Sequence, residues 1–373
     1  MSAVTAPWDT RAVAAVAGPL RYEWSAVALI PGAPDPVALD VDPDAGAYIA
    51  HDEGWAPYAQ AQITVRVPDQ DTLDLLDPRT AARIGIDAGY VYPGGQRDVH
   101  RLGELLISER VVNRPENTIT LTLESDERLV MDNAPVFWDS DDTEVWFSAT
   151  ARCSTVVGTL LNLALAYTPT IVFDPALSSE PLGADLTIEE GGSFWNAITD
   201  IADRIDAQVY HDGLGVWHVK PRPATAGRSA AQLRTGPGGT ITASRTTLSR
   251  EPWANAVVIQ YEDGNAYAIA REGAFSTAEV PRKVMTIQRD TLPRGGGARA
   301  AGALLKRTIS RGRAITLTVV DALWVRPGHT VTVQLPTGPQ ERHLVVSTRR
   351  RLGTGLMEIT TRLPDTVTIT TGE

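Results

Sequence analysis

Residues 191–221, GGSFWNAITDIADRIDAQVYHDGLGVWHVKP, predict a helix that packs against a β-hairpin. Ser193 is a suitable N-cap for a helix over residues 194–206. One face of this helix is apolar at the helical spacing, with Trp195, Ile198, Ile201, Ala202 and Ile205. The runs AQVYH and VWHVK then pair across the turn residues DGLG. We expect this unit to bury one apolar face and to form a small α+β domain in the middle of the chain.

Short runs of apolar and β-branched residues, separated by turn residues, flank this unit on both sides. On the N-terminal side they include AQITVRV, ELLISERVV and ITLTLES; on the C-terminal side they include NAVVIQYED, AITLTVV, HTVTVQL and RHLVVSTRR, interrupted by one helix over 298–311. The predicted fold is mainly β, with two barrel-like β domains flanking a small helix-plus-hairpin domain. The expected parts are an N-terminal arm at 1–19, a first β domain at 20–134, a middle α+β domain at 135–223, a linker or loop at 224–246 and a second β domain at 247–373.

The composition is that of a folded protein with substantial cores: 373 residues, of which 43% are hydrophobic and 21% charged. The single cysteine, Cys153, excludes an internal disulfide and a cysteine-based metal cluster. No apolar run approaches the ~20 residues that a membrane span needs. The first twenty residues lack the basic start of a secretory signal. We therefore expect synthesis in the cytoplasm and no membrane span.

The net charge of −11 is unevenly distributed along the chain. Residues 1–186 hold 28 acidic and 11 basic residues, a net charge of −17, whereas residues 187–373 hold 17 acidic and 23 basic residues, a net charge of +6. An acidic chain argues against tight wrapping of nucleic acid, which calls for a basic surface. The asymmetry indicates different neighbours for the two halves or contact between them in an assembly, and two solvated faces are the plainer alternative.

His211 and His218 in the hairpin are candidate metal ligands or bases. They share a face of the hairpin if the turn has two or four residues, and they do not if it has three. Zinc needs at least a third ligand, and no further His, Cys or acidic cluster is spaced to supply one. We expect surface or interface histidines, and we expect no metal or other cofactor.

Cys153 lies at the start of a predicted helix, in RCSTVV, where the helix dipole would lower the pKa of its thiol. The motif WHV places His218 in a strand further along the chain. The pair faintly resembles the Cys-Ser-Gly…His-Val-Gly pattern of NlpC/P60 cell-wall peptidases, which would imply hydrolysis through Cys153. The glycine after the serine is missing, and Lys220 stands where that family has glycine. These departures favour a partly buried structural cysteine.

Three other patterns fall short of a catalytic site. Glu189 and Glu190 are adjacent, and neighbours on a strand face opposite sides, so they cannot bracket a scissile bond. The run RGGGARAAG at 294–302 contains G-x-G-x-x-A, but it belongs to a β domain rather than a βαβ unit. Arg349–Arg351 end a predicted strand, where arginines are usually solvated. We therefore expect no catalytic residue.

The order of these pieces resembles the baseplate-hub or tail-tip hub proteins of tailed bacteriophages, often labelled minor tail proteins. The resemblance covers residues from about 20 to 365. It is carried by APYAQAQITVRVPD, by GELLISERVV…TLTLESDERLVMD, by SFWNAITDIADRIDAQVYHDGLGVWHVKP, and by NAVVIQY, GARAAGALLKR and RPGHTVTVQL…RHLVVSTRRRLGTGLMEITTR.

The resemblance implies a homotrimer whose two barrel-like domains per chain form a pseudo-sixfold ring at the tip of the virion tail. Such a ring continues the hexameric tail tube, contacts the distal tail protein above, and holds a central tip, fibre or tape-measure protein. Double-stranded DNA passes through its lumen without specific binding. We expect the acidic first domain of one chain to meet the basic last domain of the next. We also expect lumen-facing side chains to be acidic or neutral overall.

Two alternatives belong to other classes of protein. One is a tail-associated cell-wall peptidase that uses Cys153 and His218. The other is a distal tail ring protein or a receptor-binding module. The second large β domain after the middle unit disfavours the distal ring, and no aromatic pattern typical of a carbohydrate pocket supports the receptor-binding tip.

Overall fold

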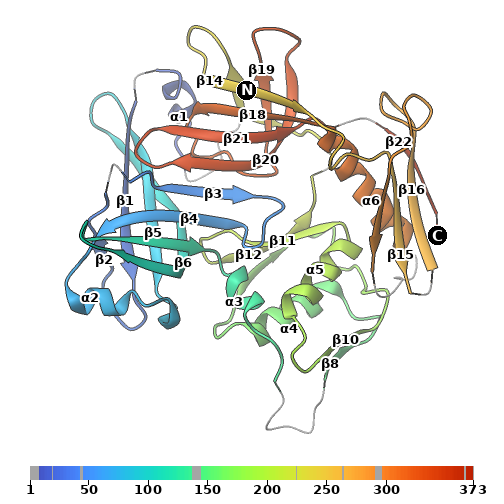
Figure 1. Ribbon diagram of the computed structural model, residues 1–373, viewed down its shortest axis with the longest axis horizontal. Helices are drawn as coiled ribbons and strands as arrows, with labels where there is room; N and C mark the ends of the chain where they lie inside the picture. The colour runs from blue at the N-terminus through green and yellow to red at the C-terminus, as the bar shows by residue number, and fades with distance from the viewer. Residues whose placement is uncertain are drawn as a thin grey trace.

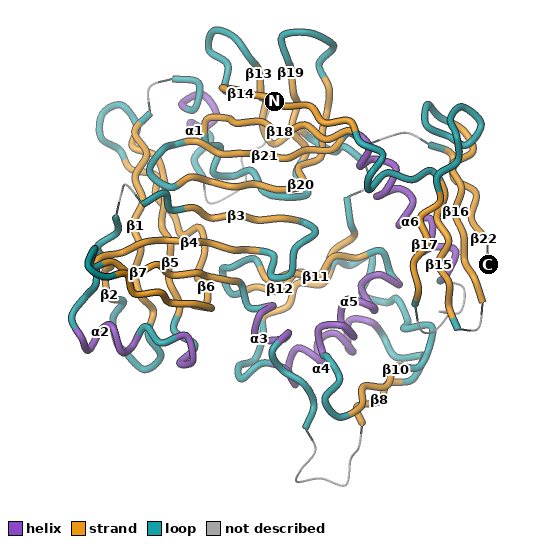
Figure 2. Tube along the Cα trace, viewed as in Figure 1, coloured by secondary structure: helices purple, strands orange, loops and turns teal. Residues whose placement is uncertain are grey.

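The structure is a computed structural model that describes residues 8–18, 20–42, 45–136, 144–223, 225–262, 264–289, 296–364 and 367–372. Its described strands form one 13-stranded sheet and three smaller sheets. Figures 1 and 2 show the early and late parts of the large sheet side by side, with a helical unit below them and a separate sheet at the right. The expectation of a mainly β fold is confirmed.

The first module, residues 21–124, is an antiparallel sheet in the order β2-β1-β5-β6-β7-β4-β3. Its strands are β1 Arg21–Leu29, β2 Val37–Leu39, β3 Tyr48–Asp52, β4 Ala59–Arg66, β5 Arg83–Val91, β6 Arg97–Asn113 and β7 Thr118–Glu124. Alternate residues of β4 and β7 are buried, as expected of a sheet with one face on a core. Two short helical segments, α2 Gln70–Leu75 and η1 Pro78–Thr80, link β4 to β5.

The second module, residues 229–248 and 313–362, has the order β13-β19-β20-β21-β18-β14. Its strands are β13 Ser229–Arg234, β14 Ile241–Leu248, β18 Arg313–Val320, β19 Thr330–Gln334, β20 Glu341–Arg351 and β21 Leu356–Arg362. The expected linker at 224–246 therefore contains a strand and most of another. Its Pro and Gly residues mark the turns, while Ala231 and Leu233 of β13 are buried and pair with β19.

The two modules have the same strand order. Taken along the chain, β1, β3, β4, β5, β6 and β7 occupy the places that β13, β14, β18, β19, β20 and β21 occupy in the second module. They differ in that β2 has no counterpart, and in that β1 pairs antiparallel to β5 whereas β13 pairs parallel to β19. The chain thus repeats one topology, which the sequence pattern alone did not reveal.

One sheet and one core join the modules. Strand β3 pairs with β20, from Asp52 opposite Ser347 to Tyr48 opposite Arg351. The largest apolar cluster takes side chains from both modules and also from the N-terminal segment, which contains α1 Arg11–Ala15 and contributes Trp8 and Ala12. The two expected β domains are thus two modules of one continuous sheet.

The middle unit has its own core and contains the predicted helix and hairpin. Helix α5 Phe194–Arg204 is capped by Ser193, whose hydroxyl accepts the N–H of Asn196 at 3.2 Å. The other elements are α3 Glu127–Met131, β8 Glu144–Phe147, α4 Cys153–Ala164, β9 Thr170–Phe173, β10 Leu186–Glu189, β11 Ala207–His211 and β12 Val216–Pro221. Trp217 of the hairpin is fully buried against α4 and α5 residues in this core.

A fourth part, the inserted unit, is built mainly from the segment between β14 and β18, and its last strand follows β21. It is a sheet in the order β17-β15-β16-β22 with helix α6 packed on it, and it has a separate core. Its elements are β15 Ala256–Tyr261, β16 Gly264–Glu272, β17 Val284–Gln288, α6 Gly297–Ile309, η2 Ser310–Gly312 and β22 Thr368–Gly372. Residues 247–373 thus hold part of the second module and this additional unit, rather than one β domain. None of the described helices combines the length and apolar character of a membrane span.

Candidate functional site

Cys153 begins α4, and its side chain is fully buried in the core of the middle unit. Burial raises the pKa of the thiol to about 11, because a thiolate would lose its hydration there. The expectation that the helix dipole lowers this pKa is therefore wrong, since desolvation outweighs the dipole. At neutral pH the group is a protonated thiol, which is a weak nucleophile.

The two hairpin histidines point to opposite faces. His211 pairs with Trp217 across the hairpin and His218 pairs with Tyr210, so the two side chains diverge. His218 stacks on Tyr210, with ring centroids 5.1 Å apart, and its Nε2 lies 3.2 Å from Asp212 Oδ2. Of the two expected positions, surface or interface, His211 does not have the first, because it is only 1% exposed. One metal ion cannot take both rings as ligands.

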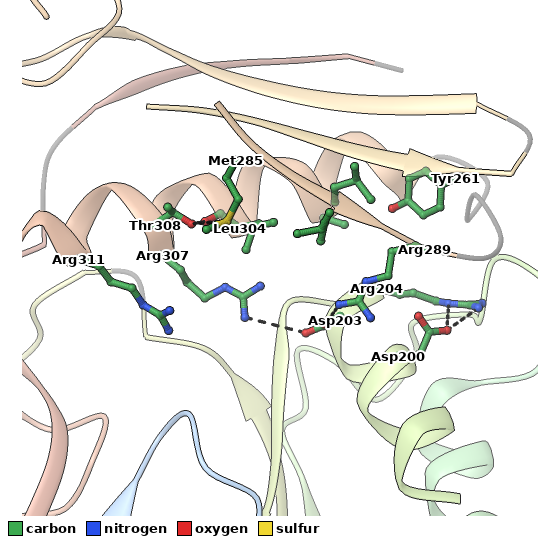
Figure 3. Close-up of a pocket in the computed structure, with 13 residues that line it drawn as sticks. Asp200, Asp203, Arg204, Tyr261, Met285, Arg289, Leu304, Arg307, Thr308 and Arg311 are labelled. Atoms are coloured by element: carbon green, nitrogen blue, oxygen red, sulfur yellow. Dashed lines mark hydrogen bonds and ion pairs between the residues drawn. The ribbon is translucent and has the colours of Figure 1, made fainter. Parts of the chain in front are cut away.

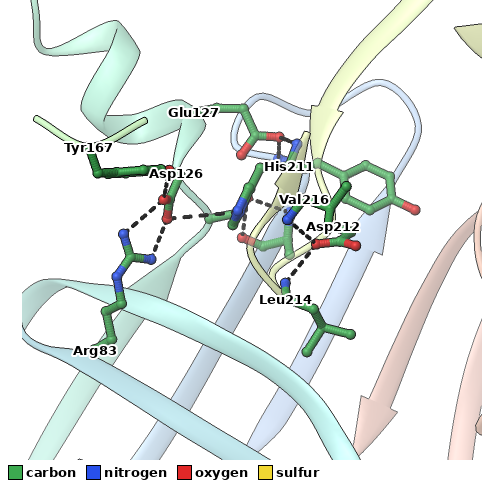
Figure 4. Close-up of polar contacts among 11 residues, drawn as sticks. Arg83, Asp126, Glu127, Tyr167, His211, Asp212, Leu214 and Val216 are labelled. Atoms are coloured by element: carbon green, nitrogen blue, oxygen red, sulfur yellow. Dashed lines mark hydrogen bonds and ion pairs between the residues drawn. The ribbon is translucent and has the colours of Figure 1, made fainter. Parts of the chain in front are cut away.

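Figure 4 shows the polar cluster around His211, where the first module meets the middle unit. Arg83 donates to both carboxylate oxygens of Asp126, and the hydroxyl of Tyr167 donates to the same carboxylate. Burial acts to raise the pKa of Asp126, but the hydrogen bonds and charges of Arg83 and its neighbours hold it below the ordinary value. Burial lowers the pKa of His211, whose Nδ1 lies 3.8 Å from Asp126. A neutral imidazole therefore lies beside a closed ion pair.

Glu127 is the second carboxylate of this cluster and is 1% exposed. Its Oε1 accepts the backbone N–H of Tyr58 at 3.3 Å and that of His211 at 2.9 Å. Burial raises the pKa of the carboxyl group to about 7. Raised carboxyl pKa values often mark catalytic acids, but this group is hydrogen-bonded to the backbone just before β4 and to the backbone of β11. It connects the first module to the hairpin.

A cavity of about 280 Å³ lies between the middle unit and the inserted unit (Figure 3). Asp203 of α5 accepts ion pairs from Arg222 at 2.7 Å, from Arg289, and from Arg307 at 4.0 Å. Burial lowers the pKa of Arg307 to about 10. Several guanidinium groups already share this one carboxylate, so the cluster links α5 to β17 and α6.

The remaining candidates are structural or exposed. Glu189 and Glu190 are both exposed. The glycine-rich run at 294–302 lies partly outside the described residues, and its described part opens α6. Arg349 and Arg351 are exposed, whereas Arg350 is fully buried, in contrast to the expectation that all three are solvated. Arg350 donates to the carbonyl oxygen of Val325, and its Nε lies 3.4 Å from Asp321 Oδ1.

The junction between the modules is the structural feature that these candidates leave unexplained. Beyond the ladder of β3 and β20, the N–H of Glu53 donates to the carbonyl of Val346 at 3.0 Å. The carboxylate of Glu53 also accepts from Arg362 of β21 at 3.2 Å, and both side chains are largely buried. At this edge the two modules are therefore joined by strand pairing and by an ion pair, in addition to the core that they share.

Each module also presents an open strand edge. In β6, residues Arg97–Leu106 pair with β5 and Leu106–Asn113 pair with β7, so no described strand lies on the β5 side of Glu109–Asn113. Strand β14 pairs only with β18 among the described strands, and seven of its eight residues are exposed. Leu248 at its end is 75% exposed. Long exposed edges are templates for pairing with another chain.

Local sequence reasoning identified neither these edges nor the repeated module, although the sequence carries a signal of the repeat. The hairpins of residues 104–124 and 342–362 have the same length, and each pairs two strands across a turn of four residues. Comparing ELLISERVVNRPENTITLTLE with RHLVVSTRRRLGTGLMEITTR at this fixed spacing would have indicated a repeated module.

No protein-family model and no curated protein matches the sequence. Solved structures do match the fold. A tail protein from Neisseria meningitidis MC58 is 13% identical with a TM-score of 0.65, covering 91% of this chain and 96% of its own. The 43 kDa tail protein of prophage MuSo2 from Shewanella oneidensis is 14% identical with a TM-score of 0.63, covering 93% and 100%.

Prophage tail protein gp18 from Listeria monocytogenes EGD-e is 11% identical with a TM-score of 0.58, covering 91% of this chain and 94% of its own. The chain has the fold of these tail proteins over nearly its whole length. The resemblance inferred from the sequence is confirmed at the level of fold.

Proposed function

We propose that the chain is a structural protein of a phage tail tip, in which three copies form a ring of six modules that caps the tail tube. The observation that carries this proposal is the repeated topology: two modules of one strand order are joined edge to edge, and an open edge remains on each. A chain built in this way is a two-module segment of a larger ring. The fold shared with tail proteins supports the same assignment.

Joining such chains head to tail gives a heterologous interface, which closes into a ring or continues as a filament. The ring contains an even number of modules, and six of them match a sixfold tube. The first half of the chain carries a net charge of −17 and the second half +6, which favours head-to-tail contact between unlike halves. DNA would pass through a lumen of acidic or neutral character.

The middle and inserted units have separate cores and lie outside the large sheet. We assign them to contacts along the tail axis, with a central tip, fibre or tape-measure protein on one side and a distal tail protein on the other. The mature location is the virion.

The role is structural rather than enzymatic in this proposal. The thiol of Cys153 is buried with a raised pKa, and His218 is held by Asp212 and Tyr210. A peptidase would need these two side chains to meet at an open cleft. Turnover of cell-wall peptide that is lost in Cys153→Ala would establish the enzymatic alternative.

Mass measurement of the purified chain, followed by imaging of intact particles, tests the proposal. Three chains of 40.1 kDa give a complex of about 120 kDa. We expect this mass and a ring with an axial pore, located at the end of the tail tube in particles. A chain that is monomeric both alone and in the presence of the tail tube, or that is absent from the tip, would overturn it.

A further inference from the structure

We propose that strand β14 of one copy pairs antiparallel with strand β6 of the next copy. The register is the same as that of the pairing between β3 and β20 within one chain. The inference rests on the proposed ring and specifies its interface residue by residue. It predicts that Arg245–Ser249 lie opposite Glu109–Asn113, and that Arg250 forms an ion pair with Glu124 of the neighbouring copy.

The first step is that β6 and β20 are equivalent position by position. Leu106 and Leu344 each pair with strands on both sides, and each is followed by a bulge after the next residue. The N–H of Ile107 donates to Ala82 at 3.1 Å, and the N–H of Val345 donates to His329 at 2.8 Å in the same way. Residues 109–113 of β6 therefore correspond to residues 347–351 of β20.

The second step is that β3 and β14 are equivalent. In the first module β3 pairs with β4, which in turn pairs with β7. In the second module β14 pairs with β18, which in turn pairs with β21. At the ends of these strands, the N–H of Asp52 donates to Tyr58 at 3.2 Å and the N–H of Ser249 donates to Gly312 at 3.0 Å. Residues 48–52 therefore correspond to residues 245–249, and Glu53 corresponds to Arg250.

The third step transfers the pairing. Within the chain, residues 347–351 of β20 pair with residues 52 to 48 of β3. The same relation places residues 109–113 of one copy against residues 249 to 245 of another. Val111 then lies opposite Thr247, and Val112 lies opposite Thr246. No described strand pairs with either segment on this side, although the side chain of Arg110 reaches back to the carbonyl of Leu73.

Backbone geometry agrees with this pairing. The N–H of Ser249 points toward β18, so the alternation of an antiparallel strand directs the N–H groups of Thr246 and Leu248 outward. In β3 the N–H of Glu53 points outward in the same sense and is satisfied by Val346 of β20. The corresponding group is the N–H of Arg250, and its predicted acceptor is the carbonyl of Ser108.

The charges provide independent support. Inside the chain, the acid Glu53 meets the base Arg362. At the proposed interface the equivalent positions are the base Arg250 and the acid Glu124, so the pair is retained with its charges exchanged. Neither side chain has an ion-pair partner within the residues that the structure describes. The internal junction and the proposed junction have their acid and base exchanged. Modules that paired in the wrong order would therefore bring like charges together, which is unfavourable.

Apolar surface beside β14 indicates that a neighbour covers this edge. A groove of about 530 Å³ runs from Leu248 past Trp253 and Phe275 to Ile309. Leu248 is 75% exposed and Phe275 is 45% exposed. The groove is continuous with the proposed strand contact, so a second copy seated on β14 would bury part of it.

Disulfide trapping in a Cys153→Ser background tests the register. Opposed residues of antiparallel strands have Cα atoms about 4.5–5.5 Å apart, which suits a disulfide. Val111→Cys with Thr247→Cys should yield covalent dimers and trimers on non-reducing gels after mild oxidation. The matched control, Val111→Cys with Thr246→Cys, moves one thiol to the opposite face and should yield at least tenfold less. Equal trapping in both variants, or trapping in neither, would overturn the inference.

Charge reversal is the second test and does not depend on thiol chemistry. Arg250→Glu and Glu124→Arg should each weaken trimer formation at least tenfold, and the double variant should restore it. Failure of the double variant to recover would contradict the ion pair. The proposed function is judged separately, since a wild-type trimer without trapping at these positions refutes only this interface, whereas a wild-type chain that never assembles refutes the ring itself.

Discussion

The two modules share strand order and hairpin register but differ in the chemistry of their interiors. At three equivalent positions the first module has Leu105, Val112 and Leu123, whereas the second has His343, Arg350 and Thr361. All three side chains of the second module are fully buried. The two modules therefore share the pairing of their backbones but differ in the side chains that fill their interiors.

The polar interior of the second module is bonded internally. Thr361 Oγ1 lies 3.2 Å from His343 Nδ1, and His343 Nε2 lies 3.2 Å from Glu341. Arg350 holds the loop that follows β18 through the carbonyl of Val325 and the carboxylate of Asp321. Where the first module has apolar packing at these positions, the second uses a network that positions a loop. Such a network stabilises a fold only while each member is paired.

Replacing Arg350 by the residue at the equivalent position of the first module should have the largest effect. Arg350→Val removes the ion-pair partner of the buried Asp321, and we expect the free energy of unfolding to fall by about 3–5 kcal/mol. Urea unfolding measures this change. Arg349→Val, one residue away on the exposed side, should cost less than about 1 kcal/mol. Equal losses for the two variants would show that the buried network is not what distinguishes the modules.

The same residue shows what the sequence could and could not reveal. The amphipathic spacing of residues 194–206 predicted α5 and its cap, and alternation predicted the strands, because both patterns are local. Three adjacent arginines give no local sign that the middle one is buried. The pairing of β3 with β20 joins residues about 300 positions apart, and neither strand specifies its partner by pattern.

Other errors have similar physical causes. Strand β13 is rich in alanine and sits among turn residues, so its composition is that of a loop until its pairing with β19 is known. The direction of the Cys153 pKa shift depends on burial, which the position at a helix N-terminus does not reveal. The diverging histidines depend on the pairing register of the hairpin.

A second prediction concerns the carboxylate of Glu127, which lies just after the last strand of the first module. The pKa of Glu127 is raised from 4.5 to about 7, so its contribution to stability is full below pH 4.5 and is lost as pH rises through 7. This amounts to about 3 kcal/mol between pH 4 and pH 8. Glu127→Gln keeps an acceptor for both N–H groups and should flatten the pH profile by that amount. Parallel profiles for wild type and variant, from denaturant unfolding at each pH, would contradict the raised pKa.

A third prediction exchanges interior chemistry in the opposite direction. Leu123→Thr introduces the residue that the second module has at this position, but the first module has Leu105 where a histidine would accept the hydroxyl. We expect a loss of about 2–3 kcal/mol from the smaller side chain and the unpaired hydroxyl. Leu123→Val, which changes size without adding a polar group, should lose about 1 kcal/mol. If the two variants lose the same free energy of unfolding, the stability of the first module does not depend on the apolar character of its interior.

The smallest effect on the isolated chain, and the sharpest test of the open edge, comes from Thr246→Pro. The N–H of Thr246 points away from β18, so a proline should change the free energy of unfolding by no more than about 1 kcal/mol. Thr247→Pro removes an N–H that points toward β18 and should cost about 3 kcal/mol in the monomer. The edge of β3 is filled by β20, whereas the edge of β14 is open, so only Thr246→Pro should leave the monomer folded and abolish its assembly. Unfolding by circular dichroism together with mass measurement separates the two outcomes. If Thr246→Pro assembles as the wild type does, β14 does not meet a neighbour as β3 meets β20, and the equivalence of the two junctions fails.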